Sequence, residues 1–400
     1  MRRTGLDNPA RPTLARFDVA AFLRDHWQKS ATLIRNPWAD WHNPLEPDEL
    51  AGLACEEGVE SRLITKALPQ SDVRTGSWQL EQGPLAEDRF GGLGKTPWTI
   101  LVQAVDQHVP AVAALIEPFR FIPDWRIDDV MVSYASDGAG VGAHYDQYDV
   151  FLIQGLGRRR WRIGQHCDET TPLLPHSDLR LLSDFEPQAE WVLEPGDILY
   201  VPPGVAHEGV ALGDDCMTYS IGFRAPSRAE LIADWCDEIV ADMTDDDRFA
   251  DPDLAAAGLA GSNPGEIMPA ALDRLHAMVL EAVGDRAAFA RWFGRFTTMP
   301  KYPDMDWSPE APIAAGALRA RLATGASFER NPASRFSFVR ESDGRLLLFV
   351  DGEMIACAGE AALVAEHLCA MPVSHIRATS QEAIALVQTL LDQGQIALME

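Results

Sequence analysis

The residues best suited to chemistry in this sequence are two histidines and an aspartate. His144 and Asp146 lie two positions apart in GVGAHYDQYDVF, and His207 follows the segment EPGDILYVPPG. Residues i and i+2 of a strand point to the same face, so one strand edge could offer an imidazole and a carboxylate to one metal. His207 comes just after a strand that ends in a tight turn. A barrel could fold that strand back beside the first.

Two histidines and one carboxylate on one face of an octahedral metal leave other positions open. This is the facial triad of non-haem iron(II) oxygenases, in which a co-substrate and O₂ bind at those positions. A His-x-Asp pair alone favours a different interpretation, a hydrogen-bonded structural pair in a loop. The PGD and YVPPG segment before His207 is typical of the second half of a cupin-type double-stranded β-helix. Together the two segments predict a metal site.

A run of arginines follows GLG at 155–157, which we predict to be a hairpin connection between two strands. Strand alternation places Arg159 on the same face as Trp161 and Ile163, and this apolar face should be the interior one. A 2-oxoglutarate co-substrate would chelate iron at one end and would need a cation for its distal carboxylate. Arginine offers a bidentate fork for this purpose. Arg159 is therefore the predicted anchor, although the whole run could instead be a solvated face that binds nearby acids.

The segment around these residues predicts a β-rich domain. From Ile122 to Ala225, short runs rich in Val, Ile, Tyr and Phe alternate with Gly and Pro turns, which is typical of an antiparallel barrel or sandwich. Before it we expect a helix at 17–29, a strand at 31–34 and a helix at 46–55. We take residues 1–226 as this domain with its N-terminal flank.

Two further parts follow the β-rich domain. Residues 227–300 are predicted to be helical, with a capping box of Ser227 and Glu230 at the start and a second helix at 269–283. Residues 301–400 combine helices with strands separated by Asp-Gly at 343–344 and 351–352, a pattern that a winged helix would produce. Acidic residues outnumber basic ones there and no lysine follows Lys301, so we predict protein contact rather than DNA binding.

The composition favours basic partners and a reducing compartment. Sixty acidic residues oppose 34 basic ones, and the net charge of -26 repels nucleic acid and anionic lipid. Solubility or a salt-tolerant host would explain this charge equally well. The six cysteines are scattered, the N-terminus has no apolar stretch, and no segment approaches the roughly 18 apolar residues of a membrane span. We therefore expect a cytoplasmic protein without membrane contact.

The same motifs resemble those of the JmjC-type ribosomal oxygenases, specifically the bacterial ribosomal protein arginine hydroxylases. The resemblance covers about residues 20–228 and is mainly architectural beyond them. It is carried by GVGAHYDQYDVFLIQGLGRRRWRIG, EPGDILYVPPGVAHEG, TYSIGFRAPS, DHWQKSATLIRNP and PDELAGLACEEGVESRLI.

The resemblance implies an α+β protein. Its JmjC double-stranded β-helix would carry N-terminal α/β elements and be followed by a helical dimerisation segment, hence a homodimer, and a winged-helix-like domain. It also implies Fe(II), 2-oxoglutarate and O₂, and 3-hydroxylation of an arginine in large-subunit ribosomal protein sixteen, a basic partner. It supports the three metal ligands and Arg159. Ser133 is the candidate for a further 2-oxoglutarate contact, although Ala135 takes one position where the family has a small polar residue.

The substrate pocket is less well defined by the sequence. Asp137, in SDGAGVG, could receive a cationic substrate side chain or could cap a turn. Tyr148 flanks the triad and could contact substrate or only pack. Three other functions stay open: a JmjC histidine or lysine hydroxylase or demethylase, a cupin enzyme that does not use 2-oxoglutarate, and a non-enzymatic ribosome-assembly factor that holds a basic protein.

Overall fold

The structure is a computed structural model that describes residues 12–66, 78–251, 263–370 and 372–399. It divides into two compact units, Met1–Ala225 and Pro226–Glu400. Among the described residues, no helix has the length and apolar character needed to cross a membrane.

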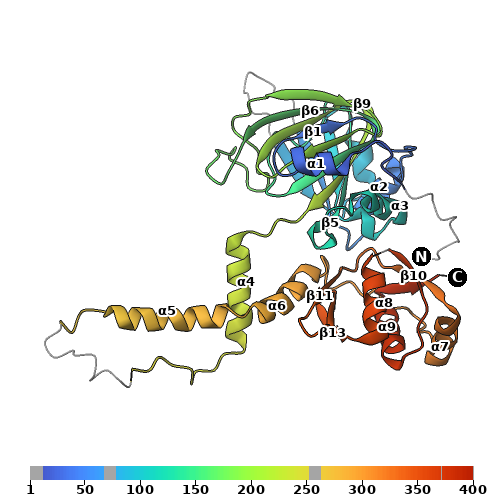
Figure 1. The fold of residues 1–400 in the computed structure, drawn as a ribbon. Coiled ribbons are helices and arrows are strands. Elements are labelled where there is room, and N and C mark those ends of the chain that lie inside the picture. The colour runs from blue at the N-terminus through green and yellow to red at the C-terminus, as the bar shows by residue number, and fades with distance from the viewer. Residues whose placement is uncertain (1–11, 67–77, 252–262, 371, 400) are drawn as a thin grey trace. The chain divides into compact units, whose positions relative to one another are not determined.

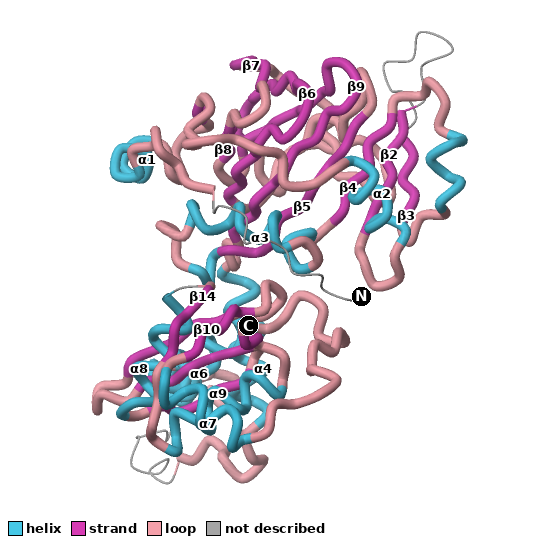
Figure 2. Tube along the Cα trace, turned by 90° about the vertical axis from the view of Figure 1, so that its right-hand side faces the viewer, coloured by secondary structure: helices cyan, strands magenta, loops and turns pink. Residues whose placement is uncertain are grey.

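The first unit is built on one antiparallel sheet that curls around an interior (Figures 1 and 2). The strand order is β1-β8-β6-β9-β5-β4-β2-β3, with β7 also paired to β6. The predicted antiparallel barrel is therefore confirmed. The strands are β1 Thr32–Ile34, β2 Ser61–Lys66, β3 Trp78–Gln82, β4 Trp98–Val102, β5 Ile127–Ala135, β6 Asp149–His166, β7 Ala189–Leu193, β8 Ile198–Val201 and β9 Val205–Phe223.

The two long strands, β6 and β9, pair with register shifts around residues 154–158. The prediction that residues 155–157 connect two strands as a hairpin is wrong, because β6 continues through them. The register with β9 shifts between Gln154 and Leu156 and again before Arg158. At Gly157, with φ of +60°, an added Cβ would lie 2.6 Å from the carbonyl oxygen of Asp215. The glycines thus mark bulges within one strand rather than a turn.

The two faces of the sheet form different cores. Along β6, Phe151 and Ile153 join an outer core with the N-terminal helices, whereas Val150 and Leu152 join a cluster in the interior. This is the alternation that a strand buried on both faces requires. The α-helices of this unit are α1 Val19–Asp25, α2 Pro47–Cys55 and α3 Pro110–Ala113. Its 3-10 helices are η1 Glu87–Gly92, η2 Val105–Gln107, η3 Ala114–Phe119 and η4 Asp124–Arg126.

The second unit contains helices and two small three-stranded sheets, β14-β10-β15 and β11-β12-β13. The predicted capping box of Ser227 and Glu230, the helix at 269–283 and both Asp-Gly turns are confirmed. The elements are α4 Arg228–Ala241, α5 Pro269–Val283, α6 Arg286–Thr298, α7 Ala315–Thr324, β10 Ala326–Arg330, β11 Phe336–Arg340, β12 Leu346–Val350, β13 Glu353–Cys357, α8 Gly359–Ala370, β14 Val373–Ile376, α9 Gln381–Asp392 and β15 Ile396–Leu398.

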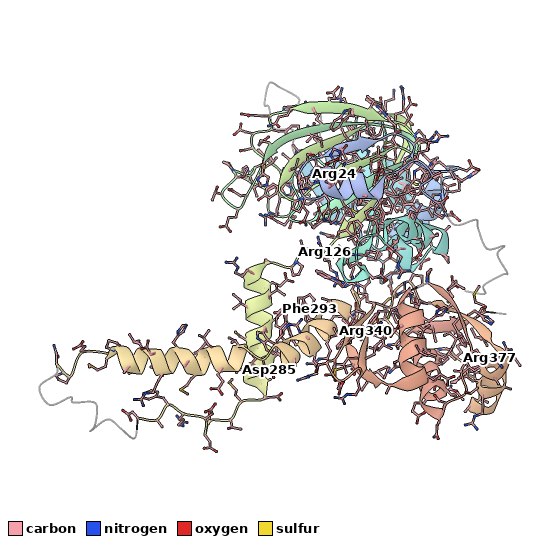
Figure 3. All side chains as sticks on the ribbon, viewed as in Figure 1. Arg24, Arg126, Asp285, Phe293, Arg340 and Arg377 are labelled. Atoms are coloured by element: carbon pink, nitrogen blue, oxygen red, sulfur yellow. The ribbon has the colours of Figure 1, made fainter. Side chains whose placement is uncertain are left out.

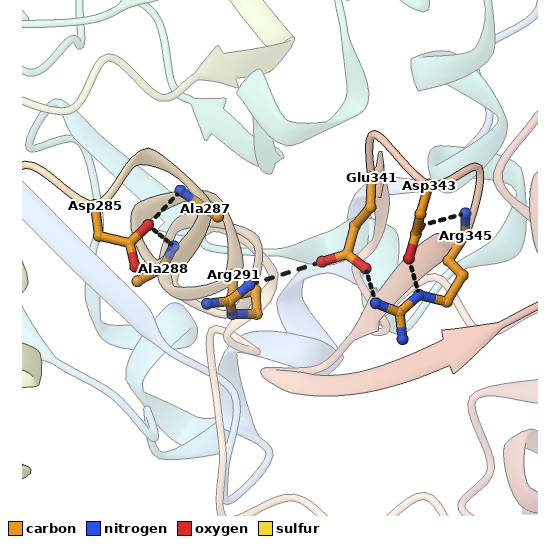
Figure 4. Close-up of polar contacts among 7 residues, drawn as sticks. All are labelled: Asp285, Ala287, Ala288, Arg291, Glu341, Asp343 and Arg345. Atoms are coloured by element: carbon orange, nitrogen blue, oxygen red, sulfur yellow. Dashed lines mark hydrogen bonds and ion pairs between the residues drawn. The ribbon is translucent and has the colours of Figure 1, made fainter.

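Helix α6 joins the helical part of this unit to the sheet β11-β12-β13. Its N-cap is Asp285, whose carboxylate accepts hydrogen bonds from the backbone N–H groups of Ala288 and Ala287, and these bonds lower the Asp285 pKa (Figure 4). Further along, Arg291 pairs with Glu341 at 3.7 Å, at the end of the β11 hairpin. On the side toward α4, aromatic rings pack together, and Figure 3 labels one of them, Phe293. The cluster is Trp235, Phe289, Trp292, Phe293 and Phe296.

Candidate active site

The structure brings the three predicted metal ligands together. One donor atom from each of His144, Asp146 and His207 lies within 4.8 Å of the others. His207 is the third residue of β9, after the turn that follows β8, and its side chain is 2% exposed. The sequence predicted that His144 and Asp146 lie on the edge of a strand. They lie instead in the segment between β5 and β6.

This segment is extended without being a regular strand. Gly138 and Gly142 have positive φ values of 72° and 85°, which interrupt regular pairing. The segment instead forms an isolated bridge to the start of β9. The N–H of His144 donates to the His207 carbonyl at 3.0 Å, and the N–H of His207 donates to the His144 carbonyl at 2.8 Å. His144 and Asp146 therefore present their donor atoms close together although neither lies in a regular strand.

Backbone carbonyls orient both imidazoles. The Nδ1 atom of His144 lies 2.9 Å from the Gly142 carbonyl oxygen, and that of His207 lies 3.0 Å from the Val205 carbonyl oxygen. A proton on Nδ1 is donated to these carbonyls, which leaves the Nε2 lone pair for a metal. The Nε2 atom of His207 lies 3.6 Å from a carboxylate oxygen of Asp146. Burial, and then the neighbouring His144, lower the His207 pKa, which favours the neutral, metal-binding form of the imidazole.

These donors fit an octahedral divalent metal such as iron(II), which takes two imidazoles and one carboxylate in a facial triad. Among the described residues, no second group of three histidine, cysteine or acidic side chains has donor atoms this close together. The Nδ1 contacts of both histidines, the lowered pKa of His207 and the set of two imidazoles and one carboxylate all suit a divalent metal ion.

A buried cation lies on the same face of the barrel. Arg159 of β6 is 3% exposed and stands opposite Ala211 of β9, two register positions from Trp161. The Trp161 ring centroid is 5.8 Å from the Arg159 Cζ atom and 5.9 Å from the His207 ring centroid, so this ring lies between the predicted anchor and the predicted metal ligands. The strand alternation predicted for the arginine run is confirmed, because Arg158 is exposed and Arg162 pairs with Glu208.

The guanidinium of Arg159 is incompletely satisfied. Its Nε atom donates to the Cys216 sulfur at 3.4 Å, but its buried Nη2 atom has no hydrogen-bond acceptor. No carboxylate among the described residues forms an ion pair with it. A buried charge without a partner is costly, so this site fits a ligand that brings its own carboxylate, such as 2-oxoglutarate.

The remaining candidates occupy separate positions. Ser133 is buried on β5, in register with Thr218 of β9. Asp137 is exposed, and its carboxylate accepts a hydrogen bond from the Gly213 N–H at 2.6 Å, a contact that suits its structural alternative. Tyr148 is 42% exposed. None of the three shares a hydrogen bond with a predicted metal ligand among the described residues.

The geometry of barrel and ligands defines a JmjC-type domain, and comparison with protein families agrees. A model of the JmjC domain matches residues 114–231, and a model of the ROXA-like winged helix matches residues 280–397. The second match begins within the region predicted to be a separate helical segment and includes α6.

Known proteins extend this likeness over most of the chain. The ribosomal protein uL16 3-hydroxylase of Escherichia coli K12 is 42% identical over 297 residues, which cover 73% of this chain and 74% of that protein. A probable ribosomal oxygenase of Haemophilus influenzae is 44% identical over 212 residues, covering 53% of this chain and 50% of the relative. This chain belongs to the JmjC-type ribosomal oxygenase family, as its motifs predicted.

Solved structures support the fold along the full length. The X-ray structure of E. coli ycfD superposes with a TM-score of 0.83 at 35% identity, covering 98% of this chain and all of that one. A structure of the same E. coli ribosomal oxygenase in complex with cobalt and 2-oxoglutarate gives a TM-score of 0.80 at 34% identity, covering 97% of this chain and all of that one. The α+β fold implied by the sequence is confirmed.

Proposed function

We propose that this protein is an Fe(II)- and 2-oxoglutarate-dependent oxygenase that hydroxylates an arginine of ribosomal protein uL16 in the cytoplasm. The observation that carries this proposal is the cluster of His144, Asp146 and His207 beside the buried, incompletely paired Arg159. The substrate comes from the name of the E. coli relative, which is a uL16 3-hydroxylase.

Each group has a distinct role in this proposal. His144, Asp146 and His207 hold the metal, and Arg159 binds the distal carboxylate of 2-oxoglutarate. When bound, iron and 2-oxoglutarate together supply the oxidising power that places one atom of O₂ into a substrate C–H bond. The chain itself supplies orientation through the Gly142 and Val205 carbonyls and an interior lined by apolar strands, which excludes water from the reacting atoms.

The substrate side of the site is proposed from charge and position. A net charge of -26 suits a basic ribosomal protein and would speed its encounter with the enzyme. Ser133 is proposed as a second 2-oxoglutarate contact because it is buried on β5, inside the barrel domain. Asp137 and Tyr148 are proposed as substrate contacts because both are exposed and flank the ligand-bearing segment in sequence.

The test is turnover of 2-oxoglutarate by the iron-loaded protein with purified uL16. We expect succinate formation that rises with uL16, and a mass gain of one oxygen atom on one arginine. The His144→Ala variant should abolish both, and Arg159→Lys should raise the KM for 2-oxoglutarate. Addition of oxygen to histidine or lysine would move the assignment to another ribosomal oxygenase. Loss of a methyl group with formaldehyde would indicate a demethylase.

Two outcomes would remove the proposal altogether. Activity that persists without 2-oxoglutarate and in Arg159→Ala would favour a cupin enzyme of another type. Tight uL16 binding that survives loss of all three ligands, with no succinate formed under any condition, would favour an assembly factor.

We also propose that the protein is a homodimer through α5. Figure 1 shows α5 crossing α4. The Trp235 indole of α4 donates a hydrogen bond to the carbonyl of Val283, the last residue of α5. No residue of α5 is buried, and apolar residues at helical spacing are about half exposed. These are Leu272, Leu275, Val279 and Leu280. An unpartnered apolar stripe of this kind is typical of a protein interface.

Light scattering after size exclusion tests this proposal. The wild type should have twice the mass of its chain, and Leu275→Glu combined with Val279→Glu should give a folded monomer. Glu281→Lys, at an exposed polar position on the same helix, is the control and should stay dimeric. A wild type that is monomeric at all concentrations would exclude this interface.

A further inference from the structure

A chain of buried polar groups leads to the anchor arginine. Cys216 of β9 is fully buried, and its sulfur lies 3.4 Å from Arg159 Nε and 3.5 Å from Gln154 Nε2. Both nitrogens are donors, so the thiol serves as the shared acceptor between two side chains of β6. Gln154 stands in the segment FLIQGLGRRRW, whereas Cys216 lies outside the segments that carry the resemblance.

Gln154 is itself held on several sides. Its amide nitrogen lies 2.7 Å from the Leu156 carbonyl oxygen and 3.2 Å from that of Met217. The hydroxyl of Thr218 donates to its amide oxygen at 3.3 Å. These contacts arise where β6 and β9 pair with bulges, so the amide lies in a fixed position beside the sulfur.

The hydrogen bond from Nε to the Cys216 sulfur restricts the orientation of the Arg159 guanidinium. A guanidinium is planar, so fixing Nε by one hydrogen bond limits where the Nη atoms can point. Arg159 is only 3% exposed, and its buried Nη2 atom has no acceptor. The unsatisfied donor and the held Nε belong to one rigid plane.

We propose that Cys216 is a positioning residue, which holds Arg159 through Nε so that its Nη donors face the distal carboxylate of 2-oxoglutarate. This inference rests on the proposed function of the same site. It assigns to the thiol no contact with the metal and no chemical step.

The chemistry of a thiol suits this task better than the alternatives. A carboxylate at this position would neutralise the guanidinium and compete with the carboxylate of the ligand. An apolar side chain would leave the Nε donor without an acceptor in a dry interior. A thiol sulfur is a weak hydrogen-bond acceptor, which can orient the guanidinium through Nε while the Nη donors stay available for the ligand. Its packing neighbours are small, namely Ala135, Ala139 and Ala211.

The test measures binding as well as activity, with Cys216→Ala and its conservative counterpart Cys216→Ser. Calorimetry on the protein loaded with Mn(II) gives the Kd for 2-oxoglutarate and for 2-oxobutyrate, which lacks the distal carboxylate. We expect Cys216→Ala to bind 2-oxoglutarate about tenfold more weakly, and Cys216→Ser to recover most of this loss. Binding of 2-oxobutyrate, binding of Mn(II), and kcat at saturating 2-oxoglutarate should stay unchanged. Cys55→Ala, on helix α2, is the control and should bind both acids like the wild type.

The outcomes separate this inference from the proposed function. An unchanged Kd for 2-oxoglutarate in Cys216→Ala, or an equal loss for both acids, would overturn the positioning role while wild-type turnover still supports the oxygenase. A metal-loaded wild type that binds no 2-oxoglutarate would overturn both. Should Cys216→Ala fail to fold, Gln154→Met keeps the side-chain length without the amide and should weaken 2-oxoglutarate selectively.

Discussion

Asp149 is a fully buried acid at the start of β6, and three segments of the chain donate to it. Arg126 Nη2 and Gln28 Nε2 each lie 2.9 Å from one carboxylate oxygen, and the Tyr200 hydroxyl lies 2.6 Å from the other. Burial, and then the hydrogen bond to Asp149, raise the Tyr200 pKa. Asp149 thus links Gln28 of the N-terminal flank and Arg126 of η4 to β6, the strand that also carries Arg159.

Asp149→Ala should therefore destabilise the first unit. Removal of one partner of a buried ion pair leaves the other charge and two donors unsatisfied, with a loss of about 3 kcal/mol in the free energy of unfolding. Urea denaturation followed by tryptophan fluorescence measures this. Asp25→Ala is the matched control, because it removes the ion pair of Asp25 with Arg24 at the surface and should leave the urea midpoint unchanged. Figure 3 labels Arg24 and Arg126, the arginines of the surface pair and the buried pair. Equal effects of the two changes would contradict this view of Asp149.

Elements were predictable where their ends depend on local signals. Pro269 begins α5 and Ser227 caps α4, and both effects operate within one turn of helix. The continuity of β6 through Gly157 depends instead on pairing with residues near Asp215, distant in sequence. The same distinction applies to the site. His144, Asp146 and His207 stand in motifs of known spacing, whereas Cys216 gains its role only from the register of β6 against β9.

The packing of α6 on β12 gives a prediction at the scale of elements. A Cβ added to Gly294 would lie 2.4 Å from the Phe349 ring, so the helix approaches the sheet too closely for any side chain. Gly294→Val should lower the free energy of unfolding of the second unit by about 2 kcal/mol through overpacking. Gly316→Ala in α7, where an added Cβ meets no atom within 4 Å, should stabilise slightly instead. Thermal denaturation of both variants decides this, and a neutral Gly294→Val would show that α6 does not rest on the sheet as described.

The charge of the whole chain predicts how substrate capture depends on salt. With a net charge of -26 and the proposed basic substrate, long-range attraction should dominate the encounter at low ionic strength. We expect the KM for uL16 to rise on the order of tenfold from low to high salt. The KM for 2-oxoglutarate should change much less, because its proposed anchor, Arg159, is buried. Initial rates in sodium chloride and in potassium glutamate test this, and equal salt dependence of the two KM values would count against electrostatic capture.

The division into two compact units predicts where the binding energy of the metal is felt. All proposed ligands and Arg159 belong to the first unit, and none belongs to Pro226–Glu400. A ligand that binds only the native state stabilises that state, by about 2.7 kcal/mol when its concentration is a hundred times its Kd. Addition of Mn(II) with 2-oxoglutarate should therefore raise protection from hydrogen exchange in β5, β6 and β9, whereas α8, α9 and β12 should exchange at their earlier rates. Chelation should reverse the effect, and Asp146→Ala should abolish it. Equal protection of both units would mean that they unfold together, and the contact boundary at Ala225 would then not separate two cooperative units.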